Sequence, residues 1–317
     1  MASLSLPRRT MAYAAVLVTA AAVVLGASRV LIGAEAAHAG YLAVMFLLSP
    51  ARALDARVRY AAAGWAVVVA MAGYAIGSLG IVPLLIGLVV VCLVQSLFRA
   101  GEVASMTRSP VNFVAFAAVA QTGAPWWHVL LGSLVGAGFM LALARVLPDK
   151  ERSPLPPVPP LRRLRYGILV AVGSIVIVLG ARWLDFPYVG WTLLSFCMIL
   201  AVGFDDRRSR ARDRVLGTIA GAVAATLLSL APAPVPLICA IVSTLLCVAY
   251  LRAGNYMMFV AFLTPAILLS SSSDAGAFSL GIGRVEAVIA SAIVALACTA
   301  AAAGMDAIAH RRDSSPG

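Results

Sequence analysis

The stretch RARDRVLGTIAGAV, residues 210–223, joins three arginines and one aspartate directly to a run of very small residues. Small side chains let helices approach closely in lipid, where the hydrophobic drive between helices is lost. Basic residues collect at the cytoplasmic ends of membrane-spanning helices. The stretch therefore predicts the cytoplasmic start of a closely packed membrane helix, and a basic vestibule that concentrates anions is the alternative role for its arginines.

The composition of the whole chain agrees with this interpretation. Of the 317 residues, 62% are hydrophobic and 12% are charged, and the mean hydropathy is +0.99. These values exclude a water-soluble domain with a polar surface. Apolar blocks long enough to cross a bilayer recur along the chain and predict an all-α transmembrane helix bundle of about twelve spans. The predicted spans are 10–28, 36–50, 59–77, 80–98, 109–122, 126–145, 164–181, 186–203, 213–231, 235–251, 255–270 and 283–305.

The basic residues predict the orientation of these spans. If both termini are cytoplasmic, all but three of the 24 Lys and Arg residues fall on the cytoplasmic side, and the exceptions are Arg29, Arg182 and Arg284. This asymmetry is typical of a multi-pass protein of the inner or plasma membrane. The net charge of +11 is then explained by orientation and by contact with membrane lipids, and we expect no nucleic-acid partner.

Groups for catalysis or metal binding are scattered. The five cysteines lie in apolar spans without CxxC spacing, and the three histidines are far apart in sequence, so we expect neither a metal site nor a cofactor. A membrane-embedded enzyme would need a nucleophile, a base or metal ligands at one depth. We therefore expect no enzymatic activity and no catalytic residues. The residues concerned are Cys92, Cys197, Cys239, Cys247, Cys298, His38, His128 and His310.

Short motifs recur in the same order in the two halves of the chain, which predicts an internal duplication. With six spans in each half, both copies would enter the membrane in the same direction. We predict a first repeat at 1–147, a proline-rich cytoplasmic linker at 148–163, a second repeat at 164–310 and a tail at 311–317. The matched motifs are LGASR with LGAR, EAAHAGY with DFPYVGW, RVRYAAAG with RVLGTIAG, and NFVAF with NYMMF.

The second half also resembles a known family, the FUSC proteins, which include fusaric acid resistance proteins and aromatic acid exporters. The resemblance is clearest over residues 188–300, and its most specific part is RVLGTIAG followed by GNY. It rests on Gly190-Trp191, Arg214, Gly217-Thr218, Gly221, Asn255-Tyr256 and Thr264. Plant aluminium-activated malate channels are distant relatives of this family.

The resemblance implies two six-helix units that export small organic, often aromatic, carboxylates. A passive organic-anion channel and a non-transporting structural membrane protein are the alternatives, and a homo-oligomer is left open. Many family members carry cytosolic domains between or after the membrane halves, whereas here a proline linker joins them. The first half has Tyr60 where the second has Gly217, so the two copies are not functionally identical.

Two short spans at corresponding positions, 109–122 and 255–270, are candidates for the substrate path, because paired short segments in repeat transporters often mark the binding site. We expect them to face each other and to offer amides, hydroxyls and aromatic rings to the substrate. We also expect Pro265 to break its helix. The alternative is that the two asparagines only cap helices. The candidate residues are Asn112, Phe116, Gln121, Asn255, Tyr256 and Thr264.

The outer arginines are candidates for an anion site at the exit. Arg182 would bind the leaving carboxylate, and Arg284 would contribute from the start of the last span. The alternative is a pair of weak rim salt bridges, in which Arg29 pairs with Glu35 and Arg182 pairs with Asp185. Glu35 and Glu286, which we place near the outer face, could carry protons, and a rim ion pair is again the alternative.

The orientation can be tested with reporter fusions. We expect a reporter placed after Asp149 or after Gly317 to be active only in its cytoplasm-sensitive form, and one inserted at Ser272 only in its exported form. The charge asymmetry is the reason for this expectation. An exported-type signal at Asp149 would contradict the twelve-span topology.

Overall fold

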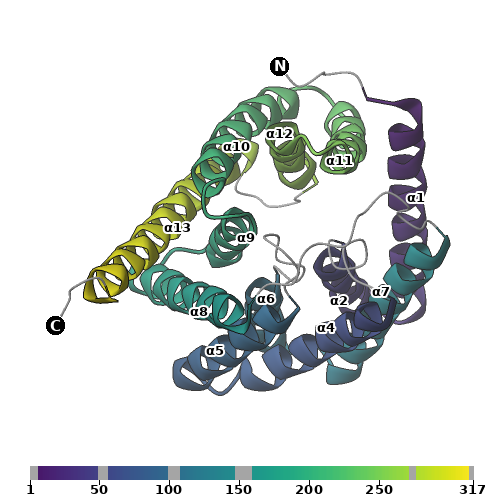
Figure 1. Ribbon diagram of the computed structural model, residues 1–317. Helices are drawn as coiled ribbons and strands as arrows, with labels where there is room; N and C mark the ends of the chain where they lie inside the picture. Colours follow the sequence, from purple (N-terminus) through teal and green to yellow (C-terminus); the bar gives the residue numbers. More distant parts are fainter. Residues whose placement is uncertain (1–5, 49–55, 99–107, 147–158, 271–275, 314–317) are drawn as a thin grey trace. The chain divides into compact units, whose positions relative to one another are not determined.

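A computed structural model describes residues 6–48, 56–98, 108–146, 159–270 and 276–313. This part of the chain contains twelve helices and no strand, which confirms the all-α prediction (Figure 1). The predicted linker, 148–163, lies outside the described residues up to 158, and its last four residues belong to the helix that begins at Pro160. The helices are α1 (Arg8–Leu31), α2 (Ala34–Leu47), α4 (Ala56–Ile76), α5 (Ile81–Leu97), α6 (Ser109–Gln121), α7 (Trp126–Val146), α8 (Pro160–Trp183), α9 (Val189–Leu200), α10 (Arg207–Ser229), α11 (Val235–Ala253), α12 (Tyr256–Leu268) and α13 (Gly276–Asp313).

The helices are those of a multi-pass membrane protein. Six are long and apolar enough to cross a bilayer, five more are shorter and apolar, and α10 adds a charged N-terminal part. Each predicted span overlaps one helix, and the boundaries differ most at α10 and α13, which ends at Asp313 and not at 305. The helix α10 begins at Arg207, so its arginines belong to the helix and not to a loop. The helix α13 begins at Gly276, seven residues before the predicted start at 283.

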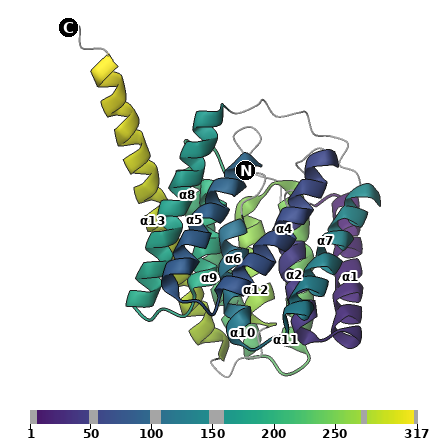
Figure 2. The same ribbon diagram turned by 90° about the horizontal axis from the view of Figure 1, so that it is seen from below.

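The chain forms two compact units, which are described separately. One contains residues 1–24 and 208–292, and the other contains residues 25–207 and 293–317. In the larger unit α2 packs along α7, and α4 packs against α6 and α7 (Figure 2). The same unit includes α8 and α9, which contact α5 and α6. The division into two repeats therefore remains a prediction, since the compact units do not follow its boundary.

Each unit holds one short helix against a longer one through a pair of glycines. In the larger unit a Cβ on Gly73 would lie 2.4 Å from the Phe113 carbonyl oxygen, and one on Gly77 would lie 2.3 Å from that of Ala117. The short helix α6 therefore rests its backbone directly on α4. Close approach at small residues is the usual packing device of membrane helices.

The other unit repeats this contact between α10 and α12. A Cβ on Gly217 would lie 2.7 Å from the Met257 carbonyl oxygen, and one on Gly221 would lie 2.5 Å from that of Ala261. Pro265 does not break α12, which continues to Leu268. A proline has no N–H to donate to the carbonyl four residues earlier, and that carbonyl belongs to Ala261, which faces Gly221.

These contacts show that both short helices begin partway along their neighbours. Since Gly73 faces Phe113 in a parallel pair, α6 starts thirteen residues into α4, about 20 Å along it at 1.5 Å per residue. By the same reasoning α12 starts nine residues into α10, about 14 Å along that helix. The N-termini of both short helices are therefore offset along the long helices beside them.

Side chains of the larger unit hold the start of α6. The Asn112 amide donates to the Leu42 carbonyl oxygen at 2.9 Å, and the Arg108 guanidinium donates to the Met45 carbonyl oxygen near the end of α2. The Ser109 N–H donates to the Gln95 carboxamide oxygen at 3.0 Å. These hydrogen bonds satisfy buried polar groups. A buried polar group without a hydrogen bond is costly in an apolar environment.

The glycine contacts predict a specific pattern of stability. We expect Gly73→Ala and Gly221→Ala to lower the free energy of unfolding by roughly 1–3 kcal/mol, because the new methyl group would overlap a backbone oxygen. Gly64→Ala in α4 is the matched control, since nothing lies within 4 Å of its Cβ position. Thermal unfolding in detergent would measure the difference, and equal midpoints for Gly64→Ala and Gly221→Ala would contradict the packing described.

Candidate anion-binding site

A buried arginine and a buried tyrosine meet at the start of α12. The Arg214 side chain is 1% exposed and that of Tyr256 is 7% exposed. The Arg214 Nη1 donates to the Tyr256 hydroxyl oxygen at 2.7 Å. Arg214 comes from the second turn of α10, and the glycine contacts of that helix bring it level with the first residue of α12.

A second arginine covers the same tyrosine. The guanidinium carbon of Arg210 lies 3.5 Å from the centroid of the Tyr256 ring. Stacking of a guanidinium on an aromatic face is favourable, and more so away from water. Because Arg210 and Arg214 are four residues apart, they lie on one face of α10. Tyr256 thus meets one guanidinium through its hydroxyl and another through its ring.

The turn before α12 places the first residue of this helix beside Arg210 and Arg214. Gly254 has a left-handed conformation with φ of 77° and closes the C-terminus of α11, which suits a residue without a side chain. The Asn255 side chain then accepts a hydrogen bond from the Met258 N–H at 3.2 Å. Capping, the alternative role for Asn255, is thereby confirmed. The helix N-terminus adds partial positive charge beside the two guanidinium groups.

The buried charge of Arg214 has no carboxylate partner among the described residues. Its Nε also has no hydrogen-bond partner there, and Tyr256 is a neutral group. An unpaired charge in a membrane bundle is expensive and commonly marks a functional site. The neighbouring Asp213 lies 3.5 Å from the exposed Arg212 instead. Within the described part of the chain, no carboxylate therefore neutralises the buried Arg214 guanidinium.

A hydroxyl follows one turn deeper on the same helix. Thr218 is 1% exposed, and its Oγ1 has no hydrogen-bond partner within the described part of the chain. It lies four residues after Arg214, on the same face of α10. Thr264 is different, because its buried hydroxyl donates to the Val260 carbonyl oxygen at 3.1 Å. Arg214, Thr218 and the start of α12 thus form a line of donors, which could hold an anion.

The candidates in the first half have packing contacts in the larger unit. Asn112 does not cap α6, which begins three residues earlier, but bonds to α2. Phe116 lies in an apolar cluster with Ala39, Ala70 and Val129. Gln121 is exposed and donates to the Gly77 carbonyl oxygen at 3.2 Å. Because these residues and the α12 residues belong to different units, the predicted facing of the two short helices remains a prediction.

The two arginines predicted to form the exit site differ in exposure. Arg182 is exposed in the last turn of α8. Arg284 is 1% exposed and lies eight residues into α13, so it does not stand at the start of this helix. Glu35 lies 3.2 Å from the Nδ1 of His128. Among the described residues, Glu35 therefore has its polar contact with this histidine and not with Arg29.

Sequence reasoning did not include Arg210, Arg214 and Thr218 among the candidate site residues. It assigned the arginines to orientation, with a basic vestibule that concentrates anions as the alternative, and the threonine to helix packing. The spacing of four residues between successive members was the available signal, because it places all three on one helix face. No group of three or more His, Cys, Asp or Glu residues that could hold a metal ion occurs in the described ranges.

The site predicts an unusual response of stability to mutation. We expect Tyr256→Phe to lower the free energy of unfolding by about 1–3 kcal/mol, because it leaves the buried Arg214 without its partner. We expect Arg214→Met to keep or raise stability, by as much as roughly 1–4 kcal/mol, because it removes a buried charge. Exposed Arg212→Met is the control. Thermal unfolding in detergent measures all three, and a larger loss for Arg214→Met than for Tyr256→Phe would argue against the site.

Comparison with known proteins agrees with the family resemblance. Residues 174–298 match the family model described as fusaric acid resistance protein-like. No curated protein and no solved structure gives a significant match. The matched segment includes Arg214, Thr218 and Tyr256, together with the glycine contacts between α10 and α12. Residues 174–298 are therefore similar to this family, as the motifs predicted, and the match together with the apolar helices supports a membrane protein of the transporter type.

Proposed function

We propose that this protein exports small aromatic carboxylates across the inner or plasma membrane, and that Arg210, Arg214 and Tyr256 form the site that binds them from the cytoplasm. The observation that carries the proposal is the buried Arg214 guanidinium, which lacks a carboxylate partner among the described residues. A carboxylate supplied by a substrate would neutralise it. A purely structural protein would gain more stability from an apolar side chain at this position.

The contacts of Tyr256 favour an aromatic substrate. The tyrosine offers an oxygen to Arg214 and a flat ring to Arg210. An aromatic carboxylate offers the same two features, with a charged oxygen in place of a neutral one. Charge-assisted bonds between guanidinium and carboxylate are roughly twice as strong as neutral hydrogen bonds. The substrate would therefore displace Tyr256 from Arg214, and the tyrosine would reoccupy the site after release.

The groups next to this site support a path along α10. Thr218 offers a hydroxyl one turn further along the helix, where a carboxylate leaving Arg214 could bind next. The N-terminus of α12 faces the same region, and its partial positive charge favours an anion. Arg182 at the outer end of α8 and the buried Arg284 remain candidates for the exit side.

Efflux measurements test this proposal. Cells that carry the protein should release a preloaded aromatic acid such as benzoate faster than cells without it, and release an aliphatic acid such as acetate no faster. Arg214→Met should abolish this efflux. Tyr256→Phe should lower the concentration that gives half-maximal efflux, because Phe keeps the ring and removes the competing hydroxyl.

Two controls make the outcome specific. Arg212→Met changes an exposed arginine two residues away, and its efflux should equal that of the wild type. Membrane levels of each variant should be measured by immunoblot. Wild-type efflux in Arg214→Met at normal membrane levels would refute the site. Efflux that an uncoupler leaves unchanged would identify a passive anion channel in place of an energised exporter.

A further inference from the structure

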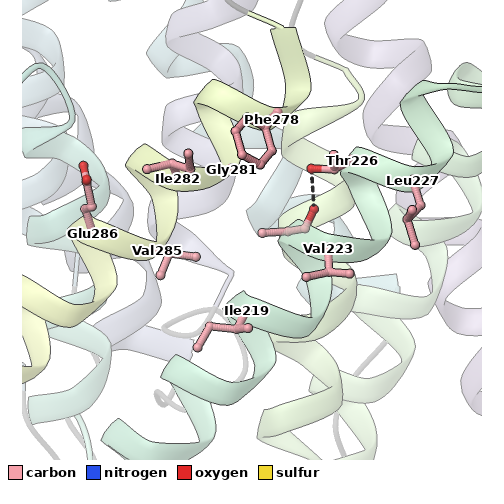
Figure 3. A pocket seen from close by; sticks show the side chains of 10 residues that line it. Ile219, Val223, Thr226, Leu227, Phe278, Gly281, Ile282, Val285 and Glu286 are labelled. Atoms are coloured by element: carbon pink, nitrogen blue, oxygen red, sulfur yellow. Dashed lines mark hydrogen bonds between the residues drawn. The ribbon is translucent and has the colours of Figure 1, made fainter.

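An apolar groove lies between α10 and α13, away from the arginine site. It has a volume of about 530 Å³, and both of its walls belong to the same compact unit. Figure 3 shows Ile219 and Val223 on one wall and Phe278, Ile282 and Val285 on the other. Val223 is 56% exposed and Phe278 is 65% exposed. In a membrane helix such exposed apolar side chains face lipid.

One carboxyl group interrupts this apolar lining. Glu286 lines the groove and is exposed. Because α13 begins at Gly276, Glu286 lies ten residues, about 15 Å, from the helix start. Glu286 therefore does not stand at the start of its helix. It belongs to a helix segment long and apolar enough to cross the bilayer, Gly276–Gly304.

Among the described residues that line the groove, none opposite Glu286 carries a charge. The α10 wall contributes Ile219, Ala222, Val223, Thr226 and Leu227, and the Thr226 hydroxyl donates to the Ala222 carbonyl oxygen at 3.0 Å. On α13 itself, Arg284 is the charged residue nearest in sequence, and it is buried. Carboxylates are rare in membrane spans and mark functional positions there.

We propose that Glu286 is a proton-binding carboxyl within the membrane-spanning helix α13. Lipid reaches this carboxyl through the groove between α10 and α13. Glu286 is consequently a modification site for apolar carbodiimides. In hydrocarbon the acid form of a carboxyl is far less costly than the ionised form. Carbodiimides react with the acid form, and an apolar one such as dicyclohexylcarbodiimide partitions into the bilayer and can enter the groove.

The labelling reaction is an addition without a leaving group. The carboxyl proton moves to one nitrogen of the carbodiimide, and the carboxylate oxygen bonds to its central carbon, which gives an O-acylisourea. The acyl group then shifts from oxygen to nitrogen, which gives a stable N-acylurea. The protein therefore gains the mass of one whole reagent molecule, and no oxidant, reductant or further reactant is needed.

The test is labelling of the whole protein in lipid vesicles, followed by mass spectrometry of its peptides. We expect dicyclohexylcarbodiimide to modify Glu286 in the wild type, and Glu286→Gln to lose this adduct. Glu35→Gln is the matched control, because Glu35 lies at the start of α2 beside His128, and it should leave labelling at Glu286 unchanged. A water-soluble carbodiimide should not modify Glu286.

A second pair of variants tests access through the groove while leaving Glu286 in place. Val223→Trp would fill the groove and should slow labelling several-fold, whereas Val242→Trp, at an exposed position on α11, should not. An unlabelled Glu286 in the wild type, or equal labelling in both tryptophan variants, would overturn the proposal. Since labelling requires no transport, its result is independent of the proposed export.

Discussion

The contact between two glycines of α10 and two backbone carbonyls of α12 determines the geometry of the arginine site. Gly217 and Gly221 let α12 lie against α10 without intervening side chains. The first residue of α12 thereby comes level with Arg214, and the Tyr256 hydroxyl accepts its hydrogen bond. A larger residue at either glycine would push the helices apart and separate the tyrosine from both arginines. The proposed anion site therefore depends on this packing motif.

The buried guanidinium of Arg214 has no carboxylate partner among the described residues. A guanidinium that is 1% exposed and bonded to a neutral phenol is costly, since desolvation is only partly offset. Under the proposed function, an incoming carboxylate would supply charge-assisted bonds that the neutral Tyr256 does not. Substrate and tyrosine would then exchange at the same two guanidinium groups.

The spans could be predicted from the sequence because hydropathy over about twenty residues is a local property. The boundaries were less accurate where composition is mixed. Residues 276–282 contain two glycines and a serine, so they did not resemble an apolar span. They are nevertheless helical, since backbone groups in a membrane must bond internally. This extension places Arg284 and Glu286 eight and ten residues into the helix, away from its start.

The role of the arginines could not be predicted from hydropathy, because it depends on α12, more than forty residues away along the chain. The charge asymmetry explained Arg214 as an orientation signal. The four-residue spacing with Arg210 and Thr218 is the local feature that distinguishes it from the exposed Arg212. The cap at Asn255 was predictable as an alternative, because asparagine before an apolar helix is a local pattern. Asn112 has the same pattern but bonds to α2 instead, a contact that only the fold reveals.

The most direct measurement of the central claim is the distance between a bound substrate and Arg214. Solid-state NMR of the protein in lipid, with ¹³C in the carboxyl group of benzoate and ¹⁵N in the arginine guanidinium groups, detects such a contact through dipolar coupling. The account predicts strong coupling in the wild type and in Arg212→Met, and its loss in Arg214→Met. Coupling that survives in Arg214→Met, or bound benzoate without coupling in the wild type, would contradict it.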